Sequence, residues 1–148
     1  MTAASIDDQP GVPQKNGGIL LAVVGAHLAG QPLNHQLTSR RARLVRSTRT
    51  ARNYRLFALA NTTPPKPGLV RVSDDAGEGI EVEVWSLAPA AFGSFVAEVP
   101  APMTIGNVQL ADGSTVKSFL CEPAALEGAK EITHFGGWRA FLAARQSR

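Results

Sequence analysis

The chain has 148 residues, of which 44% are hydrophobic and 18% are charged; this length suits one ordinary domain, and the composition excludes a disordered acidic or basic tail. Its single cysteine, Cys121, excludes an internal disulfide framework and favours a reducing compartment, so we expect a cytoplasmic protein. No apolar run approaches the ~18 residues of a membrane span and we recognise no signal peptide, so we expect no membrane association.

The net charge of +3 arises from 15 basic and 12 acidic residues, and the basic surplus is confined to one stretch. Tyr54 stands alone beside its arginines, whereas proteins that bind single-stranded nucleic acid use repeated aromatic platforms. We therefore expect no nucleic-acid partner. The stretch is either a solvated surface or a contact for a small anion. Its arginines are Arg40, Arg41, Arg43, Arg46, Arg49, Arg52 and Arg55.

The N-terminal part of the chain predicts a leader, then a buried strand, then a loop. Residues 1–18 show no apolar period, so we expect a disordered leader before one domain over residues 19–148. The sequence ILLAVV at 19–24 is a continuous apolar run of strand length, which predicts a strand buried on both faces. A loop is predicted over residues 25–30, and Pro32 predicts the first turn of a short helix reaching Leu37.

The rest of the chain is predicted to consist mostly of strands, with helices concentrated near the C-terminus. The prolines of residues 61–68 predict irregular structure there. Trp138 and Phe141 have helical spacing and are expected to pack the last helix onto the core. Strands are predicted at residues 44–50, 54–60, 69–72, 80–85, 107–110 and 114–120, and helices at 88–95, 124–132 and 138–144.

The hexapeptide IEVEVW shows the clearest alternation of the chain. It predicts that Ile80, Val82 and Val84 face the core, whereas Glu81 and Glu83 face the solvent. Strands follow one another without the regular strand–helix alternation of a doubly wound fold. We therefore predict an α+β fold, namely a small mixed, mainly antiparallel β-barrel with short peripheral helices.

The sequence lacks the motifs of phosphate-binding loops, dinucleotide-binding folds, zinc proteases and α/β-hydrolases. The spacing of His27, His35 and His134 seats no two of them on one helix face beside a carboxylate, so we expect neither a metal nor a cofactor. Cys121 follows two apolar residues and is interpreted as a small core residue rather than a nucleophile.

His27 is the candidate catalytic residue, because it lies between an apolar strand and a helix, in a loop bounded by glycines. Glycines let backbone N–H groups approach a ligand, and histidine exchanges protons near neutral pH. The alternative interpretation is that His27 only closes the strand, and that the nearby amide side chains are caps or exposed groups. The candidate substrate-binding residues of this region are Gly25, Ala26, Leu28, Asn34 and Gln36.

Residues 22–37, AVVGAHLAGQPLNHQL, resemble the opening of the C-terminal domain of allophanate hydrolase. The resemblance spans about residues 19–145, nearly the whole predicted domain. It continues in order through residues 54–59, 64–71, 80–85, 93–96, 105–108, 119–123 and 132–140.

This resemblance implies a fold of the γ-glutamyl cyclotransferase type and a role in urea degradation. In the full-length family an amidase half converts allophanate to N-carboxycarbamate, and the C-terminal half is proposed to speed the loss of CO₂ from that product. The functional histidine of this half carries over to His27. The Gly/Ser-rich Ser–Ser–Lys amidase core is absent from the sequence, so we expect no amidase activity.

The first functional hypothesis is decarboxylation of N-carboxycarbamate or a related small carboxylated urea derivative. A protonated His27 would protonate the nitrogen as the C–N bond breaks. Backbone N–H groups of the 25–30 loop, with Arg55 or Lys66, would hold the small anionic substrate.

Two alternatives come from other functional classes. The first is a non-catalytic module that binds a small acid or docks on a separately encoded amidase subunit, and a homodimer is compatible with either function. The second is a γ-glutamyl cyclotransferase, which needs a carboxylate base near the strand-end loop. No acidic residue occupies the expected place; Glu98 is nearby, but the alternation of Val96 and Val99 makes a rim position equally compatible.

Overall fold

The computed structural model describes residues 17–146. The leader predicted for residues 1–18 lies, up to residue 16, outside the described part. Strand β1 begins at Ile19, where the apolar run predicted the start of ordered structure. No helix among the described residues is long and apolar enough to cross a membrane.

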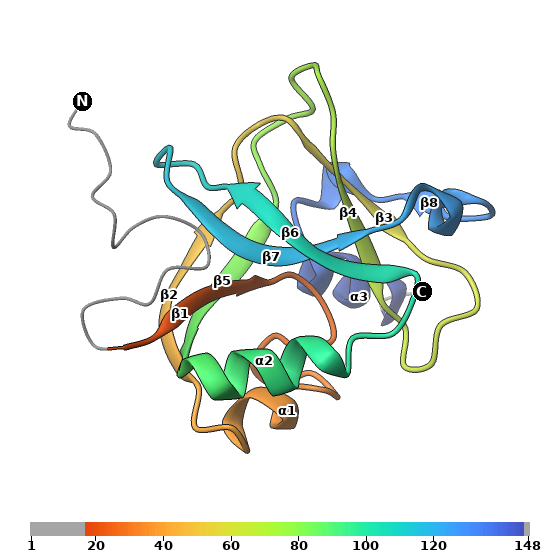
Figure 1. Ribbon diagram of the computed structural model, residues 1–148. Helices are drawn as coiled ribbons and strands as arrows, with labels where there is room; N and C mark the ends of the chain where they lie inside the picture. Colours follow the sequence, from red (N-terminus) through yellow and green to blue (C-terminus); the bar gives the residue numbers. More distant parts are fainter. Residues whose placement is uncertain (1–16, 147–148) are drawn as a thin grey trace.

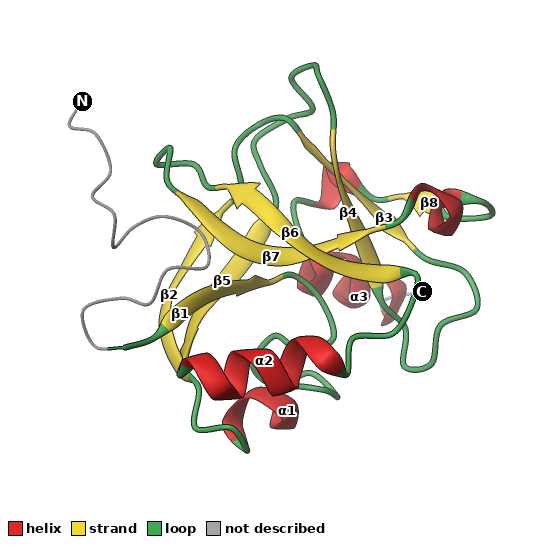
Figure 2. Cartoon of the chain, in the orientation of Figure 1, coloured by secondary structure: helices red, strands yellow, loops and turns green. Residues whose placement is uncertain are grey.

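Strands account for most of the regular structure, and the helices are short (Figures 1 and 2). Two 3-10 helices flank the last strand in sequence, Pro123–Leu126 before it and Thr133–Phe135 after it. The strands are β1 (Ile19–Val23), β2 (Arg43–Arg49), β3 (Tyr54–Ala58), β4 (Pro67–Arg71), β5 (Glu81–Leu87), β6 (Met103–Gln109), β7 (Thr115–Cys121) and β8 (Lys130–Glu131). The α-helices are α1 (His35–Thr38), α2 (Pro89–Ala97) and α3 (Trp138–Gln146).

The described strands pair into two sheets. One has the order β2-β5-β1-β7-β6 and the other β4-β3-β8. All pairings are antiparallel except that of β1 with β7. The edge strands β2 and β6 meet through one isolated bridge, between Thr50 and Leu110. The mixed α+β class is therefore confirmed, whereas the pairing does not close the sheets into the predicted barrel.

Strand β1 occupies the centre of the larger sheet, which explains its uninterrupted apolar sequence. Leu21, Ala22 and Val23 are fully buried, because neighbouring strands flank β1 and side chains cover both of its faces. Figure 1 shows α1 and α2 below β1 and α3 behind the sheets. The central strand thus carries the loop that follows it into a space between the sheet and α2.

Strand β5 confirms one half of its predicted alternation and contradicts the other. Ile80, Val82 and Val84 are fully buried and Glu81 is half-buried, but the Glu83 side chain is only 5% exposed. The prediction of a solvent-facing Glu83 is wrong, because α3 and the loop after β1 cover the second face of this strand. A strand between two others can be buried on both faces.

Two other segments differ from the predictions. Residues 124–132, predicted to be helical, form a 3-10 turn and strand β8, because Gly128 adopts a positive φ of 73° that ends helical structure. Pro67 and Gly68, predicted to be irregular, begin β4. β4 is an edge strand, so the missing N–H of Pro67 is tolerated.

Trp138 anchors the last helix to the core. It is 2% exposed, and its ring centroid lies 5.3 Å from that of Phe141. We expect Trp138→Ala to lower the free energy of unfolding by about 3–5 kcal/mol in a urea titration, because it leaves a large cavity. Gln146→Ala, at the exposed end of the same helix, should change it by less than about 0.5 kcal/mol. A loss below about 1 kcal/mol for Trp138→Ala would contradict this packing.

Candidate functional site

The 25–30 loop leaves β1 and turns tightly against the start of β4. A Cβ atom at Gly25 would lie 2.2 Å from Pro67 Cδ, so only glycine fits there. The Leu28 N–H donates to the Gly25 carbonyl at 3.0 Å, and the Leu33 N–H donates to the Ala26 carbonyl at 2.8 Å. These contacts fix the loop, and with it the direction of the side chain at its centre.

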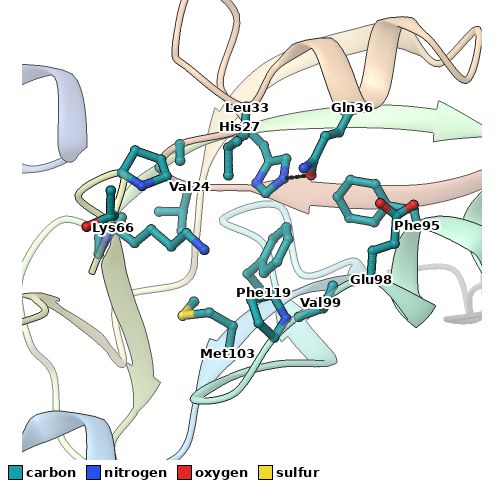
Figure 3. Close-up of a pocket in the computed structure, with 16 residues that line it drawn as sticks. Val24, His27, Leu33, Gln36, Lys66, Phe95, Glu98, Val99, Met103 and Phe119 are labelled. Atoms are coloured by element: carbon teal, nitrogen blue, oxygen red, sulfur yellow. Dashed lines mark hydrogen bonds between the residues drawn. The ribbon is translucent and has the colours of Figure 1, made fainter. Parts of the chain in front are cut away.

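The side chain at the centre of this loop is His27, whose imidazole lies between two aromatic rings (Figure 3). It stacks on Phe119 with centroids 4.9 Å apart and meets the edge of Phe95 at 5.1 Å. Its Nε2 lies 2.7 Å from Gln36 Oε1. With that amide oxygen as acceptor, Nε2 carries a hydrogen, and Nδ1 of the neutral ring is an acceptor.

The surroundings of His27 favour its neutral form. Burial lowers the pKa of His27 from the ordinary value of 6.5, and the hydrogen bond that the ring donates to Gln36 opposes this shift only in part. The charges of Lys66, His35 and Arg40 lower the pKa further. The imidazole is therefore mainly neutral at pH 7 in the free protein, and a nearby anion would favour its protonation.

His27 lines a cavity of about 250 Å³. Cavities of this size hold small molecules, since those for drug-sized ligands start at roughly 300 Å³. Its polar side chains come from His27, Gln36, Thr63, Lys66 and Glu98, and its apolar wall comes mainly from Val24, Leu33, Phe95, Val99, Met103 and Phe119. The cavity thus combines a mainly apolar wall with a few polar groups.

Two charged residues face each other across the cavity. Lys66 reaches in from the segment before β4, and Glu98 lies on the opposite side at the end of α2 (Figure 3). Among the described residues that line the cavity, Lys66 alone carries a permanent positive charge. Glu98 is 59% exposed and forms an ion pair with Arg40. The Lys66 end is therefore the attractive end for an anion.

The structure brings together some of the predicted site residues and separates others. Gly25, Ala26, His27 and Gln36 line the cavity. Leu28 does not line it, because this side chain is fully buried in the core.

Asn34 and Arg55 are also absent from the cavity wall. Asn34 supports the loop instead, since its Nδ2 donates to the His27 carbonyl at 2.8 Å. Arg55 does not line this cavity; it lies on β3, where its Nη1 contacts Glu131 at 3.3 Å. Lys66, the other cation considered from the sequence, does line it.

The aromatic and sulfur-containing parts of the cavity wall could not be predicted from the sequence. Phe119 belongs to β7 and Met103 to β6, and both line the cavity beside β1 because β7 pairs with β1 in parallel and with β6. A parallel pairing between strands about a hundred residues apart has no local signature. Glu98, which the sequence left open between a base and a rim position, lies at the cavity.

A buried ion pair holds the far end of the 25–30 loop. Glu83 Oε1 accepts hydrogen bonds from the Ala29 N–H at 2.8 Å and from Trp85 Nε1 at 3.2 Å. Arg139 Nη2 donates to Glu83 Oε2 and to the Ala29 carbonyl, both at 2.8 Å. Both backbone groups of Ala29 are therefore fixed, which ties the loop to β5 and α3.

Residues 19–143 match the family described as the allophanate hydrolase C-terminal domain. The chain belongs to this family. The resemblance noted in the sequence is thereby confirmed, and the site lies in the segment that carried it.

Regions similar to this chain occur in much longer proteins and also as nearly the whole of a short one. The urea amidolyase of Saccharomyces cerevisiae is 47% identical over 127 residues, covering 84% of this chain and 7% of that protein. The crystal structure of Kluyveromyces lactis allophanate hydrolase has a TM-score of 0.83 at 42% identity, covering 97% of this chain and 24% of that one. The structure of c4763, a uropathogenic E. coli-specific protein, has a TM-score of 0.78 at 36% identity, covering 85% and 96%.

The burial of His27 makes the stability of the domain depend on pH. Because the pKa of His27 is lower in the folded state, the unfolded state binds more protons at pH values between the folded pKa and 6.5. This contribution is complete above 6.5 and is lost as the pH falls through the folded pKa. We expect the free energy of unfolding to fall more between about pH 7.5 and about pH 5 for wild type than for His27→Leu.

The same measurement on His134→Gln is the control, since His134 is exposed and lies outside the cavity. It should keep the wild-type dependence. A His27→Leu profile parallel to that of wild type would show that His27 is protonated as readily in the folded protein as in the unfolded chain.

Removing Arg139 tests the ion pair that holds the loop. Arg139→Met leaves the Glu83 carboxylate buried without its cation, and we expect a loss of about 2 kcal/mol on urea unfolding, since Arg139 is partly exposed. Arg46→Met is the matched control, because Arg46 and Asp112 are both substantially exposed. That change should be below about 0.5 kcal/mol. Equal losses in the two variants would contradict the role of the buried pair.

Proposed function

We propose that the domain binds N-carboxycarbamate, or a related small carboxylated urea derivative, and speeds its decarboxylation. The observation that carries the proposal is a buried histidine in the wall of a cavity of small-molecule size that a lysine also lines. Membership of the allophanate hydrolase C-terminal family supports the choice of substrate, because the amidase half of that family generates N-carboxycarbamate.

Lys66 would hold the carboxylate that remains in the product. Its ammonium group is the cation of the cavity wall, and a charge-assisted hydrogen bond to a carboxylate is about twice as strong as a neutral one. In the neighbouring 25–30 loop, the carbonyls of Gly25 and Ala26 accept hydrogen bonds within the turn, and the Leu28 N–H donates one. Lys66 would supply the positive charge that orients the substrate.

The departing carboxylate would lie against the apolar wall near Phe95 and Phe119. CO₂ is neutral, so a dry surface disfavours the charged carboxylate more than the product that leaves. The C–N bond breaks, its electron pair stays on nitrogen, and nitrogen takes one proton from the His27 imidazolium. The products are CO₂ and carbamate, and His27 recovers its proton from water.

The low pKa of His27 in the free protein is compatible with proton donation, because a bound dianion would raise it. Two negative charges beside the ring favour the imidazolium, which offsets the effect of burial on the pKa. A histidine that becomes protonated only when substrate is present is a strong proton donor at the required moment. The hydrogen bond from Nε2 to Gln36 keeps the ring in one orientation throughout.

The test is CO₂ release from freshly generated N-carboxycarbamate. We expect His27→Ala to lower kcat by about 10²–10⁴-fold, the usual contribution of a positioned proton donor. Lys66→Met should mainly raise KM, because the variant keeps the length of the side chain and loses its charge. His35→Ala is the matched histidine control and should behave as wild type.

Equal rates for wild type, His27→Ala and the uncatalysed reaction would eliminate the decarboxylase proposal. A fall in rate that is the same for His35→Ala and His27→Ala would remove His27 from the reaction and leave only a general effect on folding. Thermal unfolding of each variant, measured in the same buffer, separates these outcomes.

A second candidate function is docking on an amidase. Strand β2 presents Leu44 and Val45, which are 47% and 48% exposed, at the edge of the larger sheet. In urea amidolyase the matching region belongs to a much longer chain. Sedimentation of the domain with an amidase that lacks it would show a complex, and Leu44→Lys should weaken that complex. Independent sedimentation of the two proteins would contradict docking.

A further inference from the structure

We propose that Arg40 is a positioning residue that lets the cavity accept a dianion, because it neutralises Glu98 at the rim and braces the wall behind it. This inference rests on the proposed function for the identity of the substrate, but it concerns the number of negative charges on the ligand that the cavity binds best. It assigns a role to one arginine of the basic stretch at residues 40–55.

Arg40 does not line the cavity, yet it contacts residues that do. Its Nη1 donates to the Gln36 carbonyl at 2.9 Å, and its guanidinium carbon lies 5.7 Å from the centre of the Phe95 ring. Its Nε donates to Ser94 Oγ at 2.9 Å, and its Nη2 pairs with the Glu98 carboxylate. The side chain is only 17% exposed. One guanidinium therefore connects the segment carrying Gln36 to helix α2.

The ion pair with Arg40 also changes the net charge at the rim of the cavity. Without Arg40, the carboxylate of Glu98 would face the same space as a substrate with two negative charges, and like charges repel each other. Lys66 lies on the other side of the cavity and can neutralise only one of those charges. With Arg40 in place, the rim is close to neutral, and the net attraction of the cavity for an anion is preserved.

The geometry also explains why arginine, rather than lysine, suits this position. A guanidinium presents five N–H donors in one plane, and here it serves Ser94, the Gln36 carbonyl and Glu98 at once. An ammonium group at the same place could satisfy the ion pair but not the planar set of contacts. Arg40→Lys should therefore retain part of the charge effect and lose part of the bracing.

Malonate is the probe, because it is a stable dianion with two carboxylates on one atom, and malonamate is the matched monoanion. Their dissociation constants are measured by calorimetry for wild type, Arg40→Met, Glu98→Gln and the double variant. We expect Arg40→Met to weaken malonate binding roughly three- to tenfold more than malonamate binding, a moderate effect because the rim is exposed. Adding Glu98→Gln should restore the malonate affinity.

Glu98→Gln alone keeps the charge of Arg40 and should bind malonate at least as tightly as wild type, so the inference stays testable if Arg40→Met folds poorly. Equal losses for malonate and malonamate, or no recovery in the double variant, would overturn the charge role and leave only bracing. Failure of wild type to bind malonate would also overturn it. The CO₂ assay decides the proposed function separately, since malonate binding requires no decarboxylation.

Discussion

The geometry of the site depends on how the N–H and C=O groups of Ala29 are held. The carboxylate of Glu83 and the guanidinium of Arg139 hold them at 2.8 Å each, and the pair is itself held by the central sheet and the last helix. A loop two residues from a reacting group must be rigid if that group is to stay within hydrogen-bond reach of a substrate. The C-terminal helix would thus support the proposed reaction although it lies outside the cavity wall.

The cavity combines two effects of a dry environment that normally oppose each other. In the proposed reaction, the apolar wall would destabilise the carboxylate that leaves as CO₂, and the same wall disfavours the protonated imidazole that the reaction would need. The charges of the proposed substrate would offset this effect, because they favour the imidazolium. Under the same proposal, Lys66, Arg40 and Glu98 would select the anions that enter, and the aromatic rings around His27 would position the reacting group.

The sequence could predict those parts of the structure that local patterns encode. The buried strand β1 and the loop with His27 follow from a short apolar run ended by glycine, and Gln36 is only nine residues from its partner. The burial of Glu83 could not be predicted, since alternation cannot reveal that a helix far along the chain covers the second face of a strand. The sequence favoured Arg55 as the anion partner, and no local pattern could show that Lys66 lines the cavity whereas Arg55 does not.

The central claim is that this cavity binds a small dicarboxylate between Lys66 and the ring of His27. A crystal structure of the protein with malonate tests it most directly. The account predicts one carboxylate within hydrogen-bond distance of Lys66 Nζ and the other against the rings of His27 and Phe119, with Arg40 still paired to Glu98. Malonate bound on the exposed arginines of β2, with the cavity filled only by water, would contradict the account.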